Sequence, residues 1–368
     1  MICLDNKDLD NILRGAQILG CGGGGEIEWG KGLIECAIKK GKSFKLLSIN
    51  DKNEDREDPL ICIIGAVGGG VSDEIKRKTA PILRNMSAED RMEKPILRAV
   101  EELAAYKGQD PGGFIPTEIG AGNMAVTMFA AAMQDKFVLD GDCCGRAKPM
   151  ISISTTGIAG IPQTPLACIN ALGDVMILKD ARNDIHAEDI CRSFAVVSGG
   201  TCYCARCMQK LSRYVNAMIP GSFTRCLKLG NAMSKARESA DNPASALLEV
   251  EKDAKILFRG EIISHEKKYA GGFITGMLKL KGNREYKGHN YDVWFKNEFL
   301  AGFLDARMNY KCPDLICVIN EDEYRGVSNW DDFDEETGAP VTVAGIPSHP
   351  IWKTEKGLEI FSYERLRR

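Results

Sequence analysis

The sequence predicts an α/β protein in which an N-terminal three-layer domain with a mainly parallel sheet precedes a C-terminal β-barrel-like domain. Two observations support this fold class. Over residues 1–170, short apolar runs alternate with longer segments of helical periodicity, which is typical of parallel sheets covered by helices. Beyond residue 255, nearly every apolar segment is short and ends near a glycine, as in a sandwich or barrel.

The helices expected in the first half follow from apolar residues at spacings of three and four. Leu9, Ile12, Leu13 and Ala16 form the first such pattern, which breaks at Gly20. Further helices are expected at 29–38, 73–85, 94–107 and 124–134. The buried strands between them are short apolar runs bounded by polar residues or glycine, at 44–47, 60–64 and 137–139.

The second half begins with strands and helices and then becomes mainly β. Strands are expected at 175–178 and 194–197, and helices at 204–218 and 222–239, with Ser222 as N-cap of the second helix. The later strands are expected at 256–258, 261–264, 274–280, 291–295, 299–304, 315–319 and 341–343. The predicted domains are 1–170, which carries glycine-rich crevice loops, and 171–368, which is β-rich with a helical segment at about 204–240. The acidic stretch 331–336 is expected to be one solvated loop.

Charge and hydropathy restrict the class of protein. The 368 residues contain 48 basic and 51 acidic side chains, a formal net charge of −3, which argues against binding to nucleic acid. No apolar run reaches the roughly 18 residues needed to cross a bilayer, and no basic segment followed by an apolar one begins the chain. We therefore expect a cytoplasmic protein that has no membrane contact and keeps its 14 cysteines reduced.

A glycine run precedes the helix expected at 29–38. It consists of Gly22, Gly23, Gly24 and Gly25. Bare backbone N–H groups at a helix entrance suit an anionic or carbonyl ligand, so we expect these glycines and Glu26 to bind substrate; a purely steric turn is the alternative. No Lys-Ser/Thr pair follows, as a Walker loop requires. A second glycine cluster at 65–72 follows an expected strand, and the two loops are expected to build one crevice.

Polar side chains also lie between the glycine- and proline-bearing loop at 110–113 and the helix expected at 124–134, and after the strand expected at 137–139. Glu118 is a catalytic candidate, and Asn123 either binds substrate or caps the helix behind it. Asp140 and Asp142 are two apart in an extended segment, so their carboxylates point the same way and can converge on a cation, a water or a ring N–H. They are catalytic candidates, and the metal ligands if a divalent ion such as zinc is present. Arg146 binds a substrate carboxylate or, alternatively, pairs with those aspartates.

Two groups of cysteines allow other chemistry. Cys143 and Cys144 lie beside Arg146, which favours a thiolate nucleophile or metal ligand, although they can equally well only pack. Three further soft donors, which suit zinc or an iron–sulfur cluster but lack a fourth ligand, are Cys202, Cys204 and Cys207. The four histidines form no zinc-binding pattern.

Nearly the whole chain resembles the S-methyl thiohydantoin desulfurase family, because six motifs occur in the order and approximate spacing of that family. They are LGCGGGGE at 19–26, EIGAGN at 118–123, DGDCCGRA at 140–147, AGGF at 270–273, FKNE at 295–298 and CPDLI at 312–316. The resemblance implies an N-terminal three-layer α/β domain and a barrel-like second domain. It also implies a hydrolase that removes a thiol from C2 of a thiohydantoin-type ring by attack of an activated water.

In the chemistry that the resemblance implies, Asp140 or Asp142 acts as base or metal ligand, and the glycine amides contact ring oxygens. Arg146 binds an acidic substituent of the substrate. Proteins of this family often accompany hydantoinase/oxoprolinase proteins. The resemblance therefore implies an alternative function, as a non-catalytic partner or regulatory subunit of a hydantoinase/oxoprolinase-type enzyme. A homo-oligomer is also expected. The chain departs from the family pattern at presumed crevice positions, where Cys21 replaces Thr, Glu26 replaces Asp, and Cys143-Cys144 replace Gly-Met. These departures leave the identity of the ring open.

Overall fold

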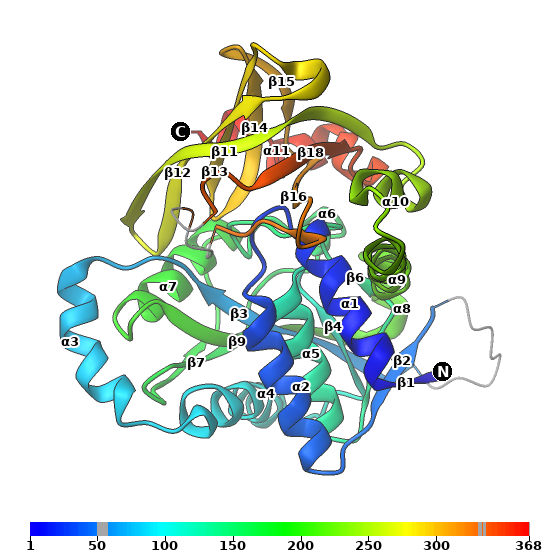
Figure 1. Ribbon diagram of the computed structural model, residues 1–368. Coiled ribbons are helices and arrows are strands. Elements are labelled where there is room, and N and C mark those ends of the chain that lie inside the picture. The colour runs from blue at the N-terminus through cyan, green and yellow to red at the C-terminus, as the bar shows by residue number, and fades with distance from the viewer. Residues whose placement is uncertain (50–57, 330–332, 334–335, 368) are drawn as a thin grey trace.

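Two large sheets lie one above the other in the computed structural model (Figure 1). The structure describes residues 1–49, 58–329, 333 and 336–367. Residues 331, 332, 334 and 335 of the predicted acidic loop therefore lie outside the described residues. In the described part of the chain, no helix combines the length and the apolar character that crossing a membrane requires.

The first sheet has eight strands in the order β1-β2-β5-β4-β3-β9-β7-β8. Their bounds are β1 Ile2–Leu4, β2 Phe44–Leu47, β3 Leu60–Gly68, β4 Gly113–Pro116, β5 Phe137–Leu139, β7 Leu166–Asn170, β8 Val175–Leu178 and β9 Thr201–Lys210. The central strands β2, β5, β4 and β3 are parallel, as predicted, whereas the flanking pairs are antiparallel. Because β8 and β9 belong to this sheet, the chain beyond residue 170 contributes to both sheets.

Helices cover both faces of the first sheet and make the N-terminal part three-layered. Strand β3 alternates between the faces, since Cys62 and Ile64 join one apolar core while Ile61 and Ile63 join another. The helices on the first face are α1 Asn6–Leu19, α2 Ile27–Lys39, α4 Lys94–Lys107, α5 Ala121–Met133 and α9 Ser222–Ser239, with α10 Pro243–Val250 beside α9. The opposite face is covered by α7 Asp184–Val196, α8 Leu211–Tyr214 and the segment around α6 Thr155–Ile158. Helix α3, Asp73–Arg84, follows β3 at the edge of the molecule, and a π-helical turn at Glu89–Glu93 leads into α4.

The structure corrects two predictions in the middle of the chain. The predicted helical segment at about 204–240 is wrong at its start, because residues 204–210 continue strand β9, and the predicted strand at 194–197 ends helix α7. Cysteine and alanine fit the periodicity of a helix as well as that of a strand. Here the pairing of this segment with β3 and β7 decides that it is a strand. The helix predicted at 222–239 is confirmed as α9, but its N-cap is Gly221 rather than Ser222.

The second sheet is antiparallel throughout, in the order β15-β14-β13-β12-β11-β18-β16-β17. Its strands are β11 Lys255–Ala270, β12 Phe273–Gly282, β13 Asn290–Lys296, β14 Glu298–Leu304, β15 Arg307–Lys311, β16 Leu315–Asn320, β17 Arg325–Gly326 and β18 Pro340–Ile346. Val293 and Val318 come from distant strands yet share one apolar core, so the sheet is strongly curved. Within the described residues no ladder joins the edge strands β15 and β17, so the sheet is open and the barrel is not confirmed.

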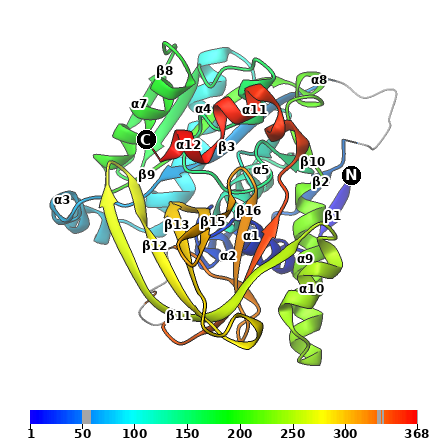
Figure 2. The same ribbon diagram turned by 90° about the horizontal axis from the view of Figure 1, so that it is seen from above.

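The C-terminal segment packs beside the second sheet, as Figure 2 shows. It contains a 3-10 turn at Pro350–Lys353 and the short helices α11 Glu355–Ile360 and α12 Tyr363–Leu366. Trp352 and Phe361 form an apolar cluster with Leu300 of β14 and with Cys144. The Trp352 indole N–H also donates to the Cys144 carbonyl at 2.7 Å, which fastens this segment to the N-terminal part.

Candidate functional site

A cavity of about 370 Å³ lies where the carboxyl ends of β3 and β4 meet the second sheet. Gly23, Gly24 and Gly25 line it together with Gly68 and Gly69. The two glycine loops therefore build one crevice, as expected, but only the second lies at a strand end, since the first joins α1 to α2. The volume is in the range of roughly 300–1,000 Å³ that is usual for small-molecule pockets.

Close packing explains why the first loop consists of glycine. A Cβ on Gly23 would lie 2.2 Å from Oε1 of Glu298, and one on Gly24 would lie 2.5 Å from the Gly120 Cα, while Gly24 also has a φ of +78°. The N–H groups of Gly24 and Gly25 donate no hydrogen bond to the described residues, so they are free to bind a ligand oxygen. Gly22 packs on Phe299 and does not line the cavity.

Glu118 enters the cavity from the loop between β4 and α5, and it is 4% exposed. Its carboxylate accepts hydrogen bonds from Asn123 Nδ2 at 2.6 Å and from the Lys148 N–H at 3.0 Å. Asn123 Oδ1 in turn accepts from the Ala66 N–H at 2.7 Å, which ties this pair to β3. Asn123 therefore orients Glu118 and lines the cavity, while Gly120 occupies the N-cap of α5.

A second buried carboxylate, Glu298, reaches the same cavity from the start of β14 and is 3% exposed. Its Oε2 has no hydrogen-bond partner among the described residues. Burial raises the pKa of Glu118 to about 7, and burial together with the negative charge of Glu118 raises the pKa of Glu298 well above its usual range. Both acids thus have raised pKa values, and ionisation of Glu118 opposes ionisation of Glu298.

Two further polar side chains on the cavity wall lack partners. Within the part of the chain that the structure describes, the Lys148 ammonium has no hydrogen-bond partner, and neither Oδ1 nor Nδ2 of Asn329, which is 1% exposed, has one. A buried polar group without a partner costs about 1–3 kcal/mol, so these groups are best explained by a polar ligand or water. The aromatic rings of Trp29 and Tyr203, with centroids 6.3 Å apart, supply apolar wall beside them.

Asp140 and Asp142 lie outside the residues that line the cavity. Asp140 accepts from the N–H groups of Phe223 and Thr224 at 2.9 and 3.1 Å, and Asp142 accepts from the Ser222 hydroxyl at 2.5 Å and from the Gly145 N–H at 2.6 Å. They point the same way, as their spacing predicted, but toward the start of α9 rather than into a pocket. Donors already occupy these oxygens, so they do not fit a divalent metal, and we propose that they cap α9.

Arg146 is also outside the cavity. Its guanidinium donates to the carbonyls of Asp314 at 2.6 Å and Phe299 at 2.7 Å, and its Nε donates to the Ala147 carbonyl at 3.0 Å. Backbone carbonyls thus take the place of both expected partners, the substrate carboxylate and the aspartates. Arg146 joins its loop to the second sheet.

The cysteines singled out in the sequence are buried. Burial raises the pKa of the Cys143 and Cys144 thiols, which argues against a thiolate nucleophile at either position. Cys202, Cys204 and Cys207 all lie in β9 but do not meet at one point, since Cys207 donates to the Pro162 carbonyl and belongs to another apolar cluster.

Sequence reasoning placed Gly23, Gly24, Gly25, Glu26, Glu118 and Asn123 at the cavity, and all of them line it. It missed Lys148, Glu298 and Asn329. Glu298 ends the FKNE motif, which was a usable signal, whereas nothing in the local sequence marked Asn329 or Lys148. Glycine loops reveal where a ligand approaches the backbone, but they do not reveal which distant side chains face them.

Comparisons with known proteins cover the whole chain. The S-Me-THD-like N-terminal domain matches residues 7–180, and the S-Me-THD-like C-terminal domain matches residues 182–365. A crystal structure of a protein from Chromobacterium violaceum has a TM-score of 0.77 and 21% sequence identity, covering 100% of this chain and 97% of that one, so the two share a fold. A search of the curated proteins gives no match. The family resemblance is thereby confirmed, and the chain belongs to the S-Me-THD-like family.

Proposed function

We propose that this protein is a hydrolase of a small hydantoin-like heterocycle and that it removes a thiol from C2 of an S-alkyl thiohydantoin. The observation that carries the proposal is the pair of buried carboxylates, Glu118 and Glu298, which line one cavity and both have raised pKa values. Membership of the S-Me-THD-like family supports the choice of ring.

Glu118 is the proposed general base. Its raised pKa lies near neutral pH, where a carboxylate is both partly ionised and basic enough to take a proton from water. As the water proton passes to Glu118, the C–O bond to C2 of the ring forms. The hydrogen bonds from Asn123 and the Lys148 N–H fix the carboxylate for this step.

Glu298 is the proposed general acid. Its raised pKa favours the protonated form, and it gives its proton to sulfur as the C–S bond breaks. The remaining water proton goes to the ring nitrogen as the C2 carbonyl forms. One water is consumed and one thiol leaves, while the neighbouring carboxyl groups exchange a proton to restore the starting state.

The unpartnered groups of the cavity suit such a ring. The carboxamide of Asn329 offers one donor and one acceptor, which matches the adjacent N–H and C=O of a cyclic amide. The N–H groups of Gly24 and Gly25 can bind a ring oxygen, and Lys148 balances an anionic ring or acidic substituent. Apart from substrate and water, the proposed reaction uses only groups of this protein.

A screen of S-alkyl thiohydantoins, hydantoins and related cyclic amides tests the proposal. Released thiol and opened ring are measured separately, and we expect one thiol per hydantoin formed, with the ring intact. Ring opening without thiol release would contradict C–S hydrolysis. Absence of turnover over the whole panel, together with co-purification with a hydantoinase/oxoprolinase-type enzyme, would instead support the non-catalytic alternative.

The two carboxyl groups predict a bell-shaped pH dependence. Glu118 must be ionised to act as base, so kcat/KM should rise as pH increases through about 7. Glu298 must be protonated to act as acid, so kcat/KM should fall again at higher pH. Initial rates across the pH range in which the protein stays folded provide the measurement, and a profile flat through pH 7 would exclude Glu118 as the base.

A further inference from the structure

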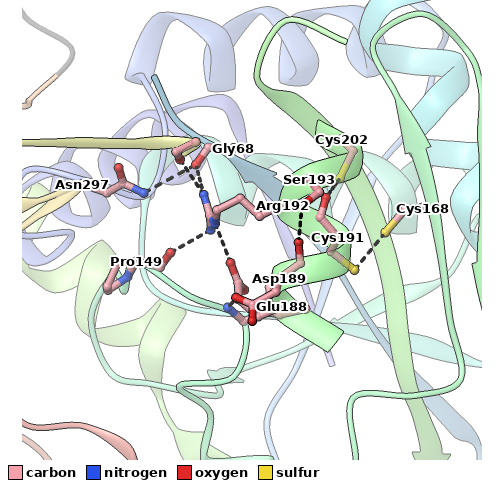
Figure 3. A network of polar contacts seen from close by, with 12 residues as sticks. Gly68, Pro149, Cys168, Glu188, Asp189, Cys191, Arg192, Ser193, Cys202 and Asn297 are labelled. Carbon is pink, nitrogen blue, oxygen red and sulfur yellow. Dashed lines mark hydrogen bonds and ion pairs between the residues drawn. The ribbon is translucent and has the colours of Figure 1, made fainter. Parts of the chain in front are cut away.

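Three buried thiols converge on the face of the first sheet that α7 covers, and none of them lines the cavity. Cys168 in β7, Cys191 in α7 and Cys204 in β9 have sulfur atoms that all lie within 4.8 Å of one another. The sulfur atoms of Cys168 and Cys191 are 3.6 Å apart. Figure 3 marks this contact with a dashed line. None of the three side chains is exposed to solvent.

Regular secondary structure holds each of these thiols in place. Cys168 and Cys204 are direct partners in the antiparallel pairing of β7 with β9, so their side chains project from the same face. Helix α7 lies on that face and presents Cys191 between the buried residues Ala187 and Ala195, one turn away on either side. Three elements that come from separate parts of the chain thus position the donors before any ligand arrives.

The spacing of the sulfur atoms suits a soft metal ion. A metal–sulfur bond of about 2.3 Å in a trigonal plane places sulfur atoms roughly 4 Å apart, close to the separations found here. Thiolates select thiophilic ions such as Cu(I), whereas zinc sites nearly always need four ligands. We propose that Cys168, Cys191 and Cys204 form a three-coordinate binding site for a thiophilic ion of the Cu(I) class.

A buried cation lies close in sequence to this group of sulfur atoms. Arg206 follows Cys204 by two residues in β9 and is 1% exposed, and its Nη1 has no hydrogen-bond partner among the described residues. The Cys202 thiol, in contrast, is directed to the Cys191 carbonyl at 3.7 Å and lies outside the group of three.

Copper loading of the full-length chain tests the site directly. The protein is purified without oxygen in the presence of a reductant, incubated with Cu(I) held in solution by acetonitrile, and desalted before its copper is measured. We expect one copper ion per chain, with three sulfur ligands in the copper X-ray absorption spectrum. Absence of bound copper, nitrogen or oxygen ligands, or four sulfur ligands would each overturn the proposal.

Single substitutions assign the ligands. Cys168→Ser, Cys191→Ser and Cys204→Ser should each weaken copper binding by about tenfold or more. Cys62→Ser is the matched control, because Cys62 is equally buried and bonds only to backbone carbonyls, and it should keep full copper binding. Equal loss in all four variants would contradict the site, and the absorption spectrum of the unmodified chain decides the matter if a variant does not fold.

Discussion

Replacement of Glu118 by glutamine should lower kcat by about 10²- to 10⁴-fold, the usual contribution of a positioned general base. Glutamine keeps the shape of the side chain and one oxygen acceptor, so the hydrogen bond from Asn123 Nδ2 at 2.6 Å can survive. It cannot take a proton from water. The measurement is the rate of thiol release at saturating substrate, together with the thermal unfolding midpoint, which should change little.

A matched change far from the cavity separates chemistry from a general effect of losing a carboxylate. Glu251→Gln alters a partly buried acid that pairs with Arg225 at 2.6 Å, outside the cavity-lining residues, and it should retain the wild-type rate. Glu298→Gln should instead remove the fall in kcat/KM at high pH, because the group that loses its proton there is gone. Full activity of Glu118→Gln would show that Glu118 is not the base.

The sequence did not show which of the predicted polar residues line the cavity and which lie outside it. Glu118 and Asp140 both follow buried parallel strands, and each carboxylate lies within two residues of a glycine. Glu118 faces the cavity because Asn123 and the second sheet surround it, whereas Asp140 meets the start of α9, which lies more than 80 residues further along the chain. The local sequence predicted a polar cluster at the strand ends. Contacts with distant segments, α9 and the second sheet, then decided the role of each residue in that cluster.

Prediction of the fold was limited in the same way, by contacts between distant parts of the chain. Long segments with one apolar face, such as α1 and α9, were predictable, and so were the short apolar strands β3 and β5. Strand β9 was not, because it is buried on both faces and its small residues have no period of their own. The sequence therefore placed the glycine loops correctly while missing the antiparallel strand that brings Cys204 to Cys168. The expected homo-oligomer stays a prediction.

Breaking the buried ion pair of α7 should strongly destabilise the protein, because removal of one partner leaves the other charge buried without compensation. Glu188 and Arg192 are joined at 2.6 Å, and both side chains are almost completely buried. Arg192 also donates to the carbonyls of Gly68, Pro149 and Gly272, so one guanidinium fixes the wall of the cavity to the second sheet, as Figure 3 shows in part.

Glu188→Gln should destabilise the protein by about 3–5 kcal/mol, because it leaves the Arg192 charge buried without its counter-ion. The single amide oxygen of glutamine can replace only one of the two carboxylate oxygens, so either Arg192 Nε or the Ile151 N–H, which Glu188 Oε2 accepts at 2.5 Å, loses its acceptor. The matched control is Glu74→Gln on α3, where an i,i+4 pair with Lys78 at 2.8 Å has the same orientation but is exposed, and its unfolding midpoint should not move. Urea unfolding of the two variants gives the comparison. Equal midpoints would mean that the backbone carbonyls around Arg192 compensate its charge without Glu188.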